Sequence, residues 1–344
     1  MLHSARDARA SILDRWSVVV VAVGATLWAL DPYFRGALVH DGLSAAEIVL
    51  VENFIICLLF LPFVVRVVAE SRRLSTARWI AMAAIAIGPQ AFATVFFTAS
   101  FSQALNHNAI AESYLLLQVQ PLVAIALAWL ILRERPQRLF WPLAILAIVA
   151  VYLVVFAPDV AAPLTAVQHG RLSIALLALV AAVLWASGTV LGRFALEEVS
   201  FITTSSLRFA LAVPVLLAIM LATNGAHGFA AYGASQLPPF LGVALIPGFA
   251  AMLIYYRGLQ STPASMATLA ETLYPVAATL IASAPAPLGF AQPLYPAQVV
   301  GTVLLMVAVV TLNVTKSRDL VGEPRPHELH PARSAIVGVS EAAS

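Results

Sequence analysis

Ten apolar segments, each long enough to cross a lipid bilayer, constrain the fold of this chain more than any other feature. A membrane-spanning helix needs roughly 20 mainly apolar residues. The segments that meet this requirement are 17–36, 45–67, 79–100, 109–132, 139–157, 172–192, 201–221, 237–259, 263–284 and 294–315. Only 10% of the 344 residues are charged, against about 25% in soluble domains. The sequence therefore predicts an all-α integral membrane protein with ten transmembrane helices.

The distribution of positive charge predicts which ends of these helices face the cytoplasm. With the N-terminus inside, 16 of the 19 lysine and arginine residues fall on the inner side and two on the outer side, while Arg208 lies within a segment. Cations near the ends of spans accumulate on the cytoplasmic side. Both the N-terminal segment 1–16 and a disordered tail 316–344 are therefore predicted to be cytoplasmic. A cleaved signal peptide is the alternative interpretation of segment 17–36, but no convincing small-residue cleavage site follows it.

The chain repeats itself, at low identity but with preserved spacing. The matching stretches are "LWALDPYFRGAL" (27–38) with "LWASGTVLGRFAL" (184–196), "LSAAEIVLVENF" (43–54) with "VSFITTSSLRFA" (199–210), and "FSQALNHNAIAESYLLLQVQP" (101–121) with "YYRGLQSTPASMATLAETLYP" (255–275). Five spans per repeat is an odd number, so the second repeat is predicted to be inserted upside down. The predicted units are a first repeat 17–157, a linker 158–171 and a second repeat 172–315.

Several of these stretches also resemble a known family. "AIAESYLLLQVQPLVAIALAWLILRERP" and "YYRGLQSTPASMATLAETLYPVAATLIA" look like the fourth and ninth spans of EamA-type transporters in the drug/metabolite transporter (DMT) superfamily, and "LWASGTVLGRFALEEVSFITTSSLRFALAVP" is similar to the sixth and seventh. The resemblance covers about 17–315 and implies a ten-helix carrier that exports amino acids, related metabolites or toxic solutes. The first repeat departs from the family in "VENF", where an arginine is frequent, and the second lacks the charged ending "LRERP".

Apart from Arg35, Arg66 and Arg257 near span ends, six charged residues lie within the predicted spans: Asp31, Glu47, Glu52, Glu112, Arg208 and Glu271. A charged side chain at membrane depth costs roughly 2.5–3.5 kcal/mol and must face protein or water. Glu47 lies near a span end and is interpreted as interfacial. At about 1.5 Å per residue, Glu52 and the repeat-equivalent Arg208 differ by about 10 Å in depth. Glu271 lies at the depth of Arg208, so a Glu271–Arg208 pair is predicted. Separate satisfaction of each by water or amides is the alternative.

Four carboxylates are candidates for proton coupling: Asp31, Glu52, Glu112 and Glu271. Asp31 and Arg35 are spaced i, i+4 and can pair on one helical face, a contact that we interpret as structural. Glu52 has no cationic partner at its depth. Three acidic residues in the outer half with one arginine nearby predict an electronegative vestibule, in which carboxylates can exchange protons.

The stretch "ESYLLLQVQPLV" (112–123) carries a carboxylate, two amides and a proline in an otherwise apolar segment. At about 100° per residue, Tyr114 and Gln118 lie on nearly the opposite face from Asn108 and Glu112. A helix that is polar on several sides cannot face lipid, so protein and a cavity are predicted to surround it. For each amide, a hydrogen bond that only fixes helix packing is the alternative.

A cavity between the repeats is predicted to bind the solute. The candidate lining residues are Trp28, Asn53, Gln90, Tyr114, Gln118, Trp185, Arg208, Tyr256, Glu271 and Tyr274. Trp28 and Trp185 occupy equivalent places in the two repeats, with helix packing as the alternative role of each. Gly88-Pro89 and Pro247-Gly248 are predicted to interrupt the third and eighth spans, as in carriers whose helices flex.

These features predict a secondary-active transporter in the cell membrane that exports a small organic solute by proton coupling or exchange. The alternatives are a facilitative uptake permease of the same fold and a channel. The expected partners are the lipid bilayer and the solute, and a homodimer is compatible with the sequence. No Gly-rich phosphate loop indicates ATP use, and nothing indicates nucleic acid. Cys57 is the single cysteine, which excludes an internal disulfide and a thiolate cluster.

No enzyme, cofactor or metal site is expected. Two groupings resemble acid–base or metal sets: His107 with Glu112, and "HELH" at 327–330. The histidine of the first is in a loop, and the second lies in the tail, which lacks fixed geometry. Neither grouping therefore favours catalysis.

Overall fold

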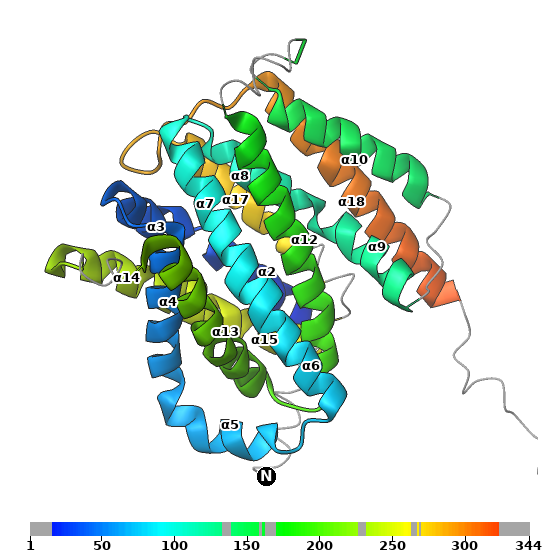
Figure 1. Cartoon of the computed structure of the whole chain (residues 1–344). Helices are drawn as coiled ribbons and strands as arrows, with labels where there is room; N and C mark the ends of the chain where they lie inside the picture. The colour runs from blue at the N-terminus through cyan, green and yellow to red at the C-terminus, as the bar shows by residue number, and fades with distance from the viewer. Residues whose placement is uncertain are drawn as a thin grey trace, which may run out of the picture.

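The computed structural model describes residues 16–132, 139–157, 160–161, 170–225, 232–262, 267 and 270–322, and these form helices and turns without a strand (Figure 1). The first half contains α2 (Ser17–Trp28), α3 (Asp31–His40), α4 (Ala45–Phe60), η1 (Leu61–Phe63), α5 (Val64–Ser71), α6 (Thr76–Ile85), η2 (Ala86–Phe92), α7 (Ala93–Asn106), α8 (Ile110–Leu115), η3 (Leu116–Val119), α9 (Gln120–Leu132) and α10 (Phe140–Val155). The second half contains α12 (Arg171–Ala195), α13 (Phe201–Asn224), η5 (Ala234–Gln236), α14 (Leu237–Val243), η6 (Ala244–Ala250), α15 (Ala251–Leu259), α17 (Leu273–Ser283) and α18 (Pro296–Gly322).

The predicted all-helical fold is confirmed for these residues. Six helical stretches are long and apolar enough to cross a membrane: Ser17–His40, Ala45–Ser71, Thr76–Asn106, Arg171–Ala195, Phe201–Asn224 and Ala234–Leu259. The other four predicted segments contain shorter or interrupted apolar helices, namely α8 to α9, α10, α17 and the first part of α18. Ten crossings and cytoplasmic termini stay predictions. Most of the predicted segment 1–16, linker 158–171 and tail 316–344 lies outside the described residues.

Prolines shape three of the long helical stretches. Pro32 stands in the first turn of α3, where its missing N–H is not needed, and Asp31 is the first residue of that helix. Pro89 and Pro247 lie inside the π-helical turns η2 and η6, because a proline removes an i→i−4 hydrogen bond. The predicted interruptions of these two segments are confirmed. Such π turns are frequent at functional sites.

The first part of the polar stretch in the fourth predicted segment is completely enclosed. Every residue from Ile110 to Gln118 is buried, and Glu112 and Tyr114 have no exposed surface. The helix tightens to the 3₁₀ turn η3 before Gln120 and Pro121 start α9. The predicted enclosure by protein is therefore confirmed for residues 110–118.

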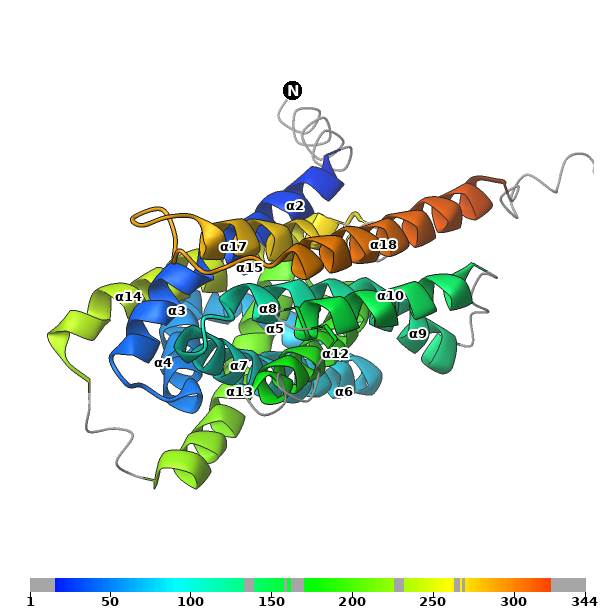
Figure 2. The same cartoon turned by 90° about the horizontal axis from the view of Figure 1, so that it is seen from above.

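Helix pairs join the two halves of the chain. The pairs are α2 with α15, α4 with α13, α7 with α12, α8 with α17 and α10 with α18, the last of which lie side by side along one edge of the molecule (Figures 1 and 2). In the predicted repeat, α2 corresponds to α12 and α7 corresponds to α15, so the pair α2–α15 is equivalent to the pair α12–α7. Each of the other three pairs joins a helix to its own equivalent in the other half. This is the pattern expected of two equivalent halves that contact each other through these helices.

The second long helix of each half, α4 and α13, follows a serine. The carboxylate that caps this serine comes from a different part of the chain in the two helices. At α4, Ser44 and Glu47 form a capping box in which the Ser44 N–H donates to Glu47 at 2.7 Å. At α13, the equivalent Ser200 donates its N–H and its hydroxyl to Glu70 of α5, at 2.9 and 2.6 Å. A carboxylate satisfies the free N–H groups at a helix start and complements its dipole. Glu70 of the first half thus caps a helix of the second.

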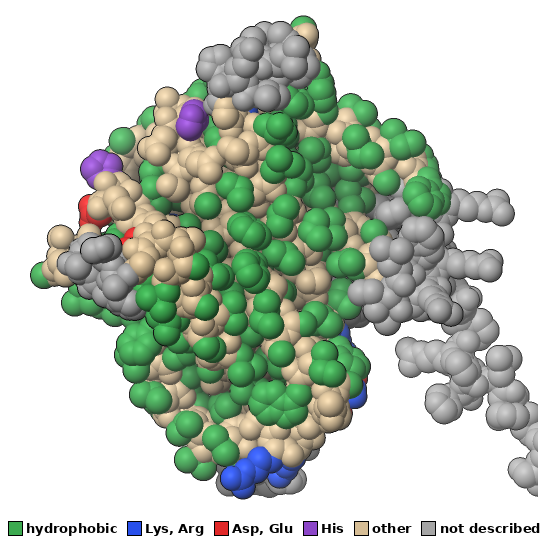
Figure 3. Space-filling model, in the orientation of Figure 1, with side chains coloured by type: hydrophobic (Ala, Val, Ile, Leu, Met, Phe, Trp, Pro, Cys, Tyr) green, Lys and Arg blue, Asp and Glu red, His purple; other side chains and the backbone are tan. Residues whose placement is uncertain are grey.

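The sides of the molecule are apolar. Figure 3 shows hydrophobic side chains over most of the visible face, with lysine and arginine gathered at the end where α5 lies. Val65 and Ile148 are 80% and 69% exposed. Soluble monomers rarely expose large contiguous apolar patches, so lipid covers this surface.

Candidate functional site

The described residues border a cavity of about 120 Å³ where the two halves meet. Of the predicted lining residues, Trp28, Gln90, Trp185, Arg208, Tyr256, Glu271 and Tyr274 border it. Asn53, Tyr114 and Gln118 do not. Asn53 lies behind Gln90, whose amide N–H donates to it at 3.1 Å, and the Tyr114 ring packs behind Tyr274 at 5.7 Å between centroids.

Aromatic rings from separate helices form much of the cavity wall. Trp28 of α2 packs against Tyr255 and Tyr274, with ring centroids 5.0 and 5.9 Å apart. Phe97 of α7 packs against Trp185 of α12 at 5.2 Å. Aromatic faces and edges bind other flat rings in offset or edge-to-face contact. The wall is therefore suited to a solute that contains a planar ring.

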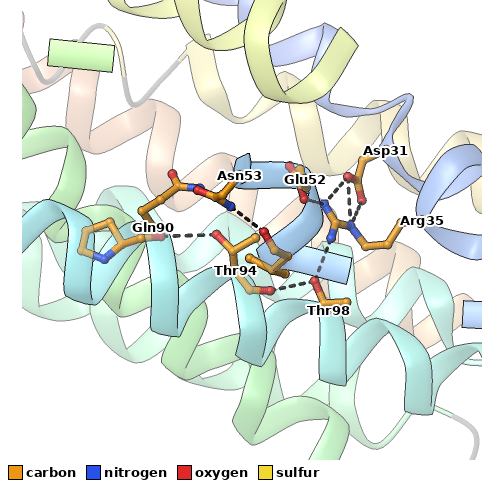
Figure 4. A network of polar contacts seen from close by, with 9 residues as sticks. Asp31, Arg35, Glu52, Asn53, Gln90, Thr94 and Thr98 are labelled. Carbon is orange, nitrogen blue, oxygen red and sulfur yellow. Dashed lines mark hydrogen bonds and ion pairs between the residues drawn. The ribbon is translucent and has the colours of Figure 1, made fainter. Parts of the chain in front are cut away.

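A buried charge network borders the same cavity (Figure 4). The Arg35 guanidinium donates to Asp31 at 2.7 Å and to Glu52 at 2.9 Å. It also donates to the Thr98 hydroxyl at 2.9 Å, and Thr98 in turn donates to the Thr94 carbonyl at 2.7 Å. All three charged residues are at most 5% exposed.

The prediction that Glu52 has no cationic partner is therefore wrong, and the expected pair of Asp31 with Arg35 is confirmed. Arg35 was assigned to the end of the first span, but its long side chain reaches Glu52 from there. Such side chains bury their stems while placing the charged group at a distance. One guanidinium thus serves two carboxylates in this network.

Arg208 of α13 is held by neutral groups. Its Nε donates to the Gln90 amide oxygen at 2.5 Å and its Nη1 to the Tyr256 hydroxyl at 3.1 Å. The Gln90 amide projects from the π turn η2 and is linked to Asn53 of α4 (Figure 4). The guanidinium is therefore fixed by an amide from the first half and a phenol from the second.

Glu271 has its own neutral partners. The Tyr255 hydroxyl donates to Glu271 at 2.5 Å, and the Thr189 hydroxyl lies 3.4 Å from the same oxygen. No ion pair within 4.0 Å joins Glu271 and Arg208, although both side chains border the cavity. The predicted direct pair is wrong, and the alternative of separate partners is what the structure has.

Glu112 lies apart from the other proton-coupling candidates. It has no exposed surface, does not border the cavity, and accepts a hydrogen bond from Arg171 at 2.9 Å. Arg171 starts α12 and was placed on the outer side from sequence, but not as this partner. The predicted vestibule of three outer acidic residues is wrong, because Asp31 and Glu52 share Arg35 while Glu112 has Arg171.

Sequence reasoning missed several cavity residues. These include Thr94, Phe97, Thr189, Met252 and Tyr255. A usable signal exists for one of them, because Thr189 follows Trp185 by four residues, one helical turn. No group of three or more His, Cys, Asp or Glu side chains in the described ranges is arranged to hold a metal ion.

Known proteins resemble this chain in sequence and in fold. The model of the EamA-like transporter family matches residues 15–156 and again 172–314. The riboflavin transporter ImpX of Fusobacterium nucleatum subsp. nucleatum is 28% identical over 211 residues, which are 61% of this chain and 68% of that protein. A solved structure described only as the crystal structure of a protein has a TM-score of 0.56 and 16% identity, and covers 88% of this chain and 98% of its own. At that identity it shows the fold alone.

The two matched ranges together span most of the chain, and the helices within them are long, apolar and exposed on the sides of the molecule. The resemblance noted in the sequence is thereby confirmed, and so is a multi-pass location in the membrane. The chain belongs to the EamA-like transporter family and is a membrane transporter.

Proposed function

We propose that this transporter binds a small organic solute with a planar ring in the cavity between its two halves and moves it by secondary-active transport. One observation carries the proposal: the same buried cavity combines aromatic walls with Arg208 and Glu271, two ionisable side chains held by neutral partners. Small-molecule sites combine apolar and aromatic walls with a few placed polar groups in this way. The aromatic rings would hold the solute, and the ionisable groups would orient it and link its movement to an ion.

The similarity to a riboflavin transporter supports a ring-containing solute. Riboflavin carries a flat three-ring system with a flexible polyol, so its ring could lie against Trp28, Trp185 or Tyr274. Riboflavin is therefore the first solute to test with this chain.

The proposed architecture is ten crossings in two inverted repeats with both termini in the cytoplasm. Two matches to one family model and the pairing of equivalent helices across the halves support it, since five crossings per half invert the second half. We expect a reporter fused after Ser317 to read cytoplasmic and one inserted at Gly225 to read external. Alkaline phosphatase and green fluorescent protein fusions measure this. Both positions on the same side would contradict ten crossings.

We place proton coupling at Glu271, because its carboxylate borders the cavity without a direct cationic partner. In proteoliposomes, wild-type protein is expected to accumulate radiolabelled riboflavin saturably under a pH gradient. Glu271→Gln is expected to bind riboflavin and exchange it across the membrane, but to lose accumulation driven by the gradient, because an amide cannot take up and release the proton. Flux is measured in both vesicle orientations, which also tests the predicted direction of export.

Asp41→Asn is the matched control, because Asp41 is an exposed carboxylate outside the cavity. It is expected to behave as wild type. Gradient-driven accumulation that survives Glu271→Gln would remove Glu271 from the coupling step. A flux that does not saturate would indicate a channel, and saturable flux that ignores the gradient would indicate a facilitative permease.

A further inference from the structure

Two buried arginines border the cavity, and they differ in the partners that the protein gives them. Arg35 is 3% exposed and has carboxylates of Asp31 and Glu52 within 2.9 Å. Arg208 is 7% exposed, yet among the described residues no carboxylate lies within 4.0 Å of it. Its hydrogen-bond acceptors are the amide of Gln90 and the hydroxyl of Tyr256. One guanidinium is thus neutralised by the protein, and the other is only positioned by it.

A buried cation without a counter-charge is costly, because burial removes the water that would solvate it. Glu271 borders the same cavity, but its carboxylate is directed to the Tyr255 and Thr189 hydroxyls instead. Among the described residues, Arg208 therefore has no carboxylate at hydrogen-bond range. A ligand with an anionic group would supply the missing counter-charge at hydrogen-bond range.

The geometry of Arg208 is suited to such a group. A guanidinium has five N–H donors in a planar fork, and the bonds to Gln90 and Tyr256 use Nε and one N–H of Nη1. The remaining N–H groups have no acceptor among the described residues, and the side chain borders the cavity. Carboxylates and phosphates match this fork and bind it with two parallel hydrogen bonds.

We infer that Arg208 recognises an anionic group on the transported solute, so that the preferred substrates are planar aromatic or heteroaromatic carboxylates or phosphates. This inference rests on the proposed function and narrows its substrate class. The ring would lie against the aromatic wall that includes Trp28 and Trp185. The anion would point away from the network of Asp31, Arg35 and Glu52, in which two carboxylates share one guanidinium. Gln90 and Tyr256 would act as positioning residues that hold the fork.

Two pairs of compounds that differ in charge test the inference. Indole-3-acetate and indole-3-acetamide have nearly the same shape, and riboflavin 5′-phosphate differs from riboflavin by its phosphate. Calorimetric titration of the full-length protein in detergent measures affinity for each, and flux in proteoliposomes measures transport. A hydrogen bond to a charged group changes affinity by roughly 10- to 100-fold, so the anion of each pair is expected to bind more tightly by that factor.

Arg208→Gln is expected to abolish the preference while leaving affinity for the neutral compounds unchanged. Arg72→Gln, which removes an exposed cation that does not border the cavity, is the control and should keep the preference. The comparison within wild-type protein needs no variant, so it stands even if Arg208→Gln fails to fold.

Equal affinity for anion and neutral compound in the wild type, or a preference that persists in Arg208→Gln, would overturn the inference. If the neutral compounds bind and are transported without a preference for the anions, the proposed function stands and the anion site does not. If none of the four compounds binds, the proposal of a ring-containing solute fails together with the inference.

Discussion

Arg35→Gln is expected to destabilise the protein more than any other single change at the cavity. The Arg35 guanidinium is bonded to both Asp31 and Glu52, and all three side chains are buried. Removing one partner of a buried ion pair costs about 3–5 kcal/mol, because the other charge is left uncompensated. Here a single substitution leaves two buried carboxylates, Asp31 and Glu52, without their shared cation. We expect a low yield of monodisperse protein and a melting temperature lower by roughly 10 °C, measured by intrinsic fluorescence in detergent.

Two further variants separate charge from shape. Arg208→Gln removes an arginine of similar burial whose direct partners are neutral, so it is expected to cost less stability than Arg35→Gln. Combining Arg35→Gln with Asp31→Asn and Glu52→Gln removes all three charges, and most of the lost stability should return. A triple variant as unstable as Arg35→Gln would show that the loss comes from packing rather than from uncompensated carboxylates.

Local patterns in the sequence were sufficient to predict much of the fold. The apolar segments became helices, because each carries too few polar groups to be anything else in lipid. Pro89 and Pro247 interrupt their helices, as expected from the hydrogen bond that proline removes. The polar faces of the stretch around Glu112 correctly predicted that protein surrounds it. Each of these conclusions depends on residues close together in the chain.

The Asp31–Arg35 pair follows from its i, i+4 spacing, but the charge partners that are distant in the sequence could not be predicted in the same way. The position of a residue in the sequence gives its depth in the membrane. Which side chains come into contact also depends on the rotation of each helix and on its neighbours. Glu271 and Arg208 were assigned similar depth, yet each forms its hydrogen bonds with neutral side chains. The π turn η2 changes the local register of its helix, so a helical wheel does not give the direction of Gln90. For Glu112 and Arg171, no sequence pattern indicated that the starts of α8 and α12 are adjacent.

Gly24→Val is expected to force α2 away from α15 and so to open one wall of the cavity. A Cβ at Gly24 would lie 2.7 Å from the backbone nitrogen of Tyr255 and 2.9 Å from the carbonyl oxygen of Ala251. Both atoms belong to the α15 backbone, so neither can move unless α15 moves. Small residues at contacts between membrane helices allow backbones to approach this closely. The same helices carry Trp28 and Tyr255, whose rings are in contact at 5.0 Å between centroids. Overpacking of this kind costs typically about 1–3 kcal/mol, and the larger valine side chain places the variant at the upper end.

Gly88→Ala is the matched control for this effect. A Cβ there would meet only the flexible Leu184 side chain, at an ordinary contact distance of 3.6 Å, so melting temperature and riboflavin affinity should stay near wild type. Gly24→Ala is expected to lie between the control and Gly24→Val in both measurements, because one methyl group already meets backbone. Gly258 offers a second test on the partner helix, since its Cβ would lie 2.8 Å from the Val21 nitrogen. If Gly24→Val kept wild-type stability and affinity, the close contact of α2 and α15 would not be what sets the width of the cavity.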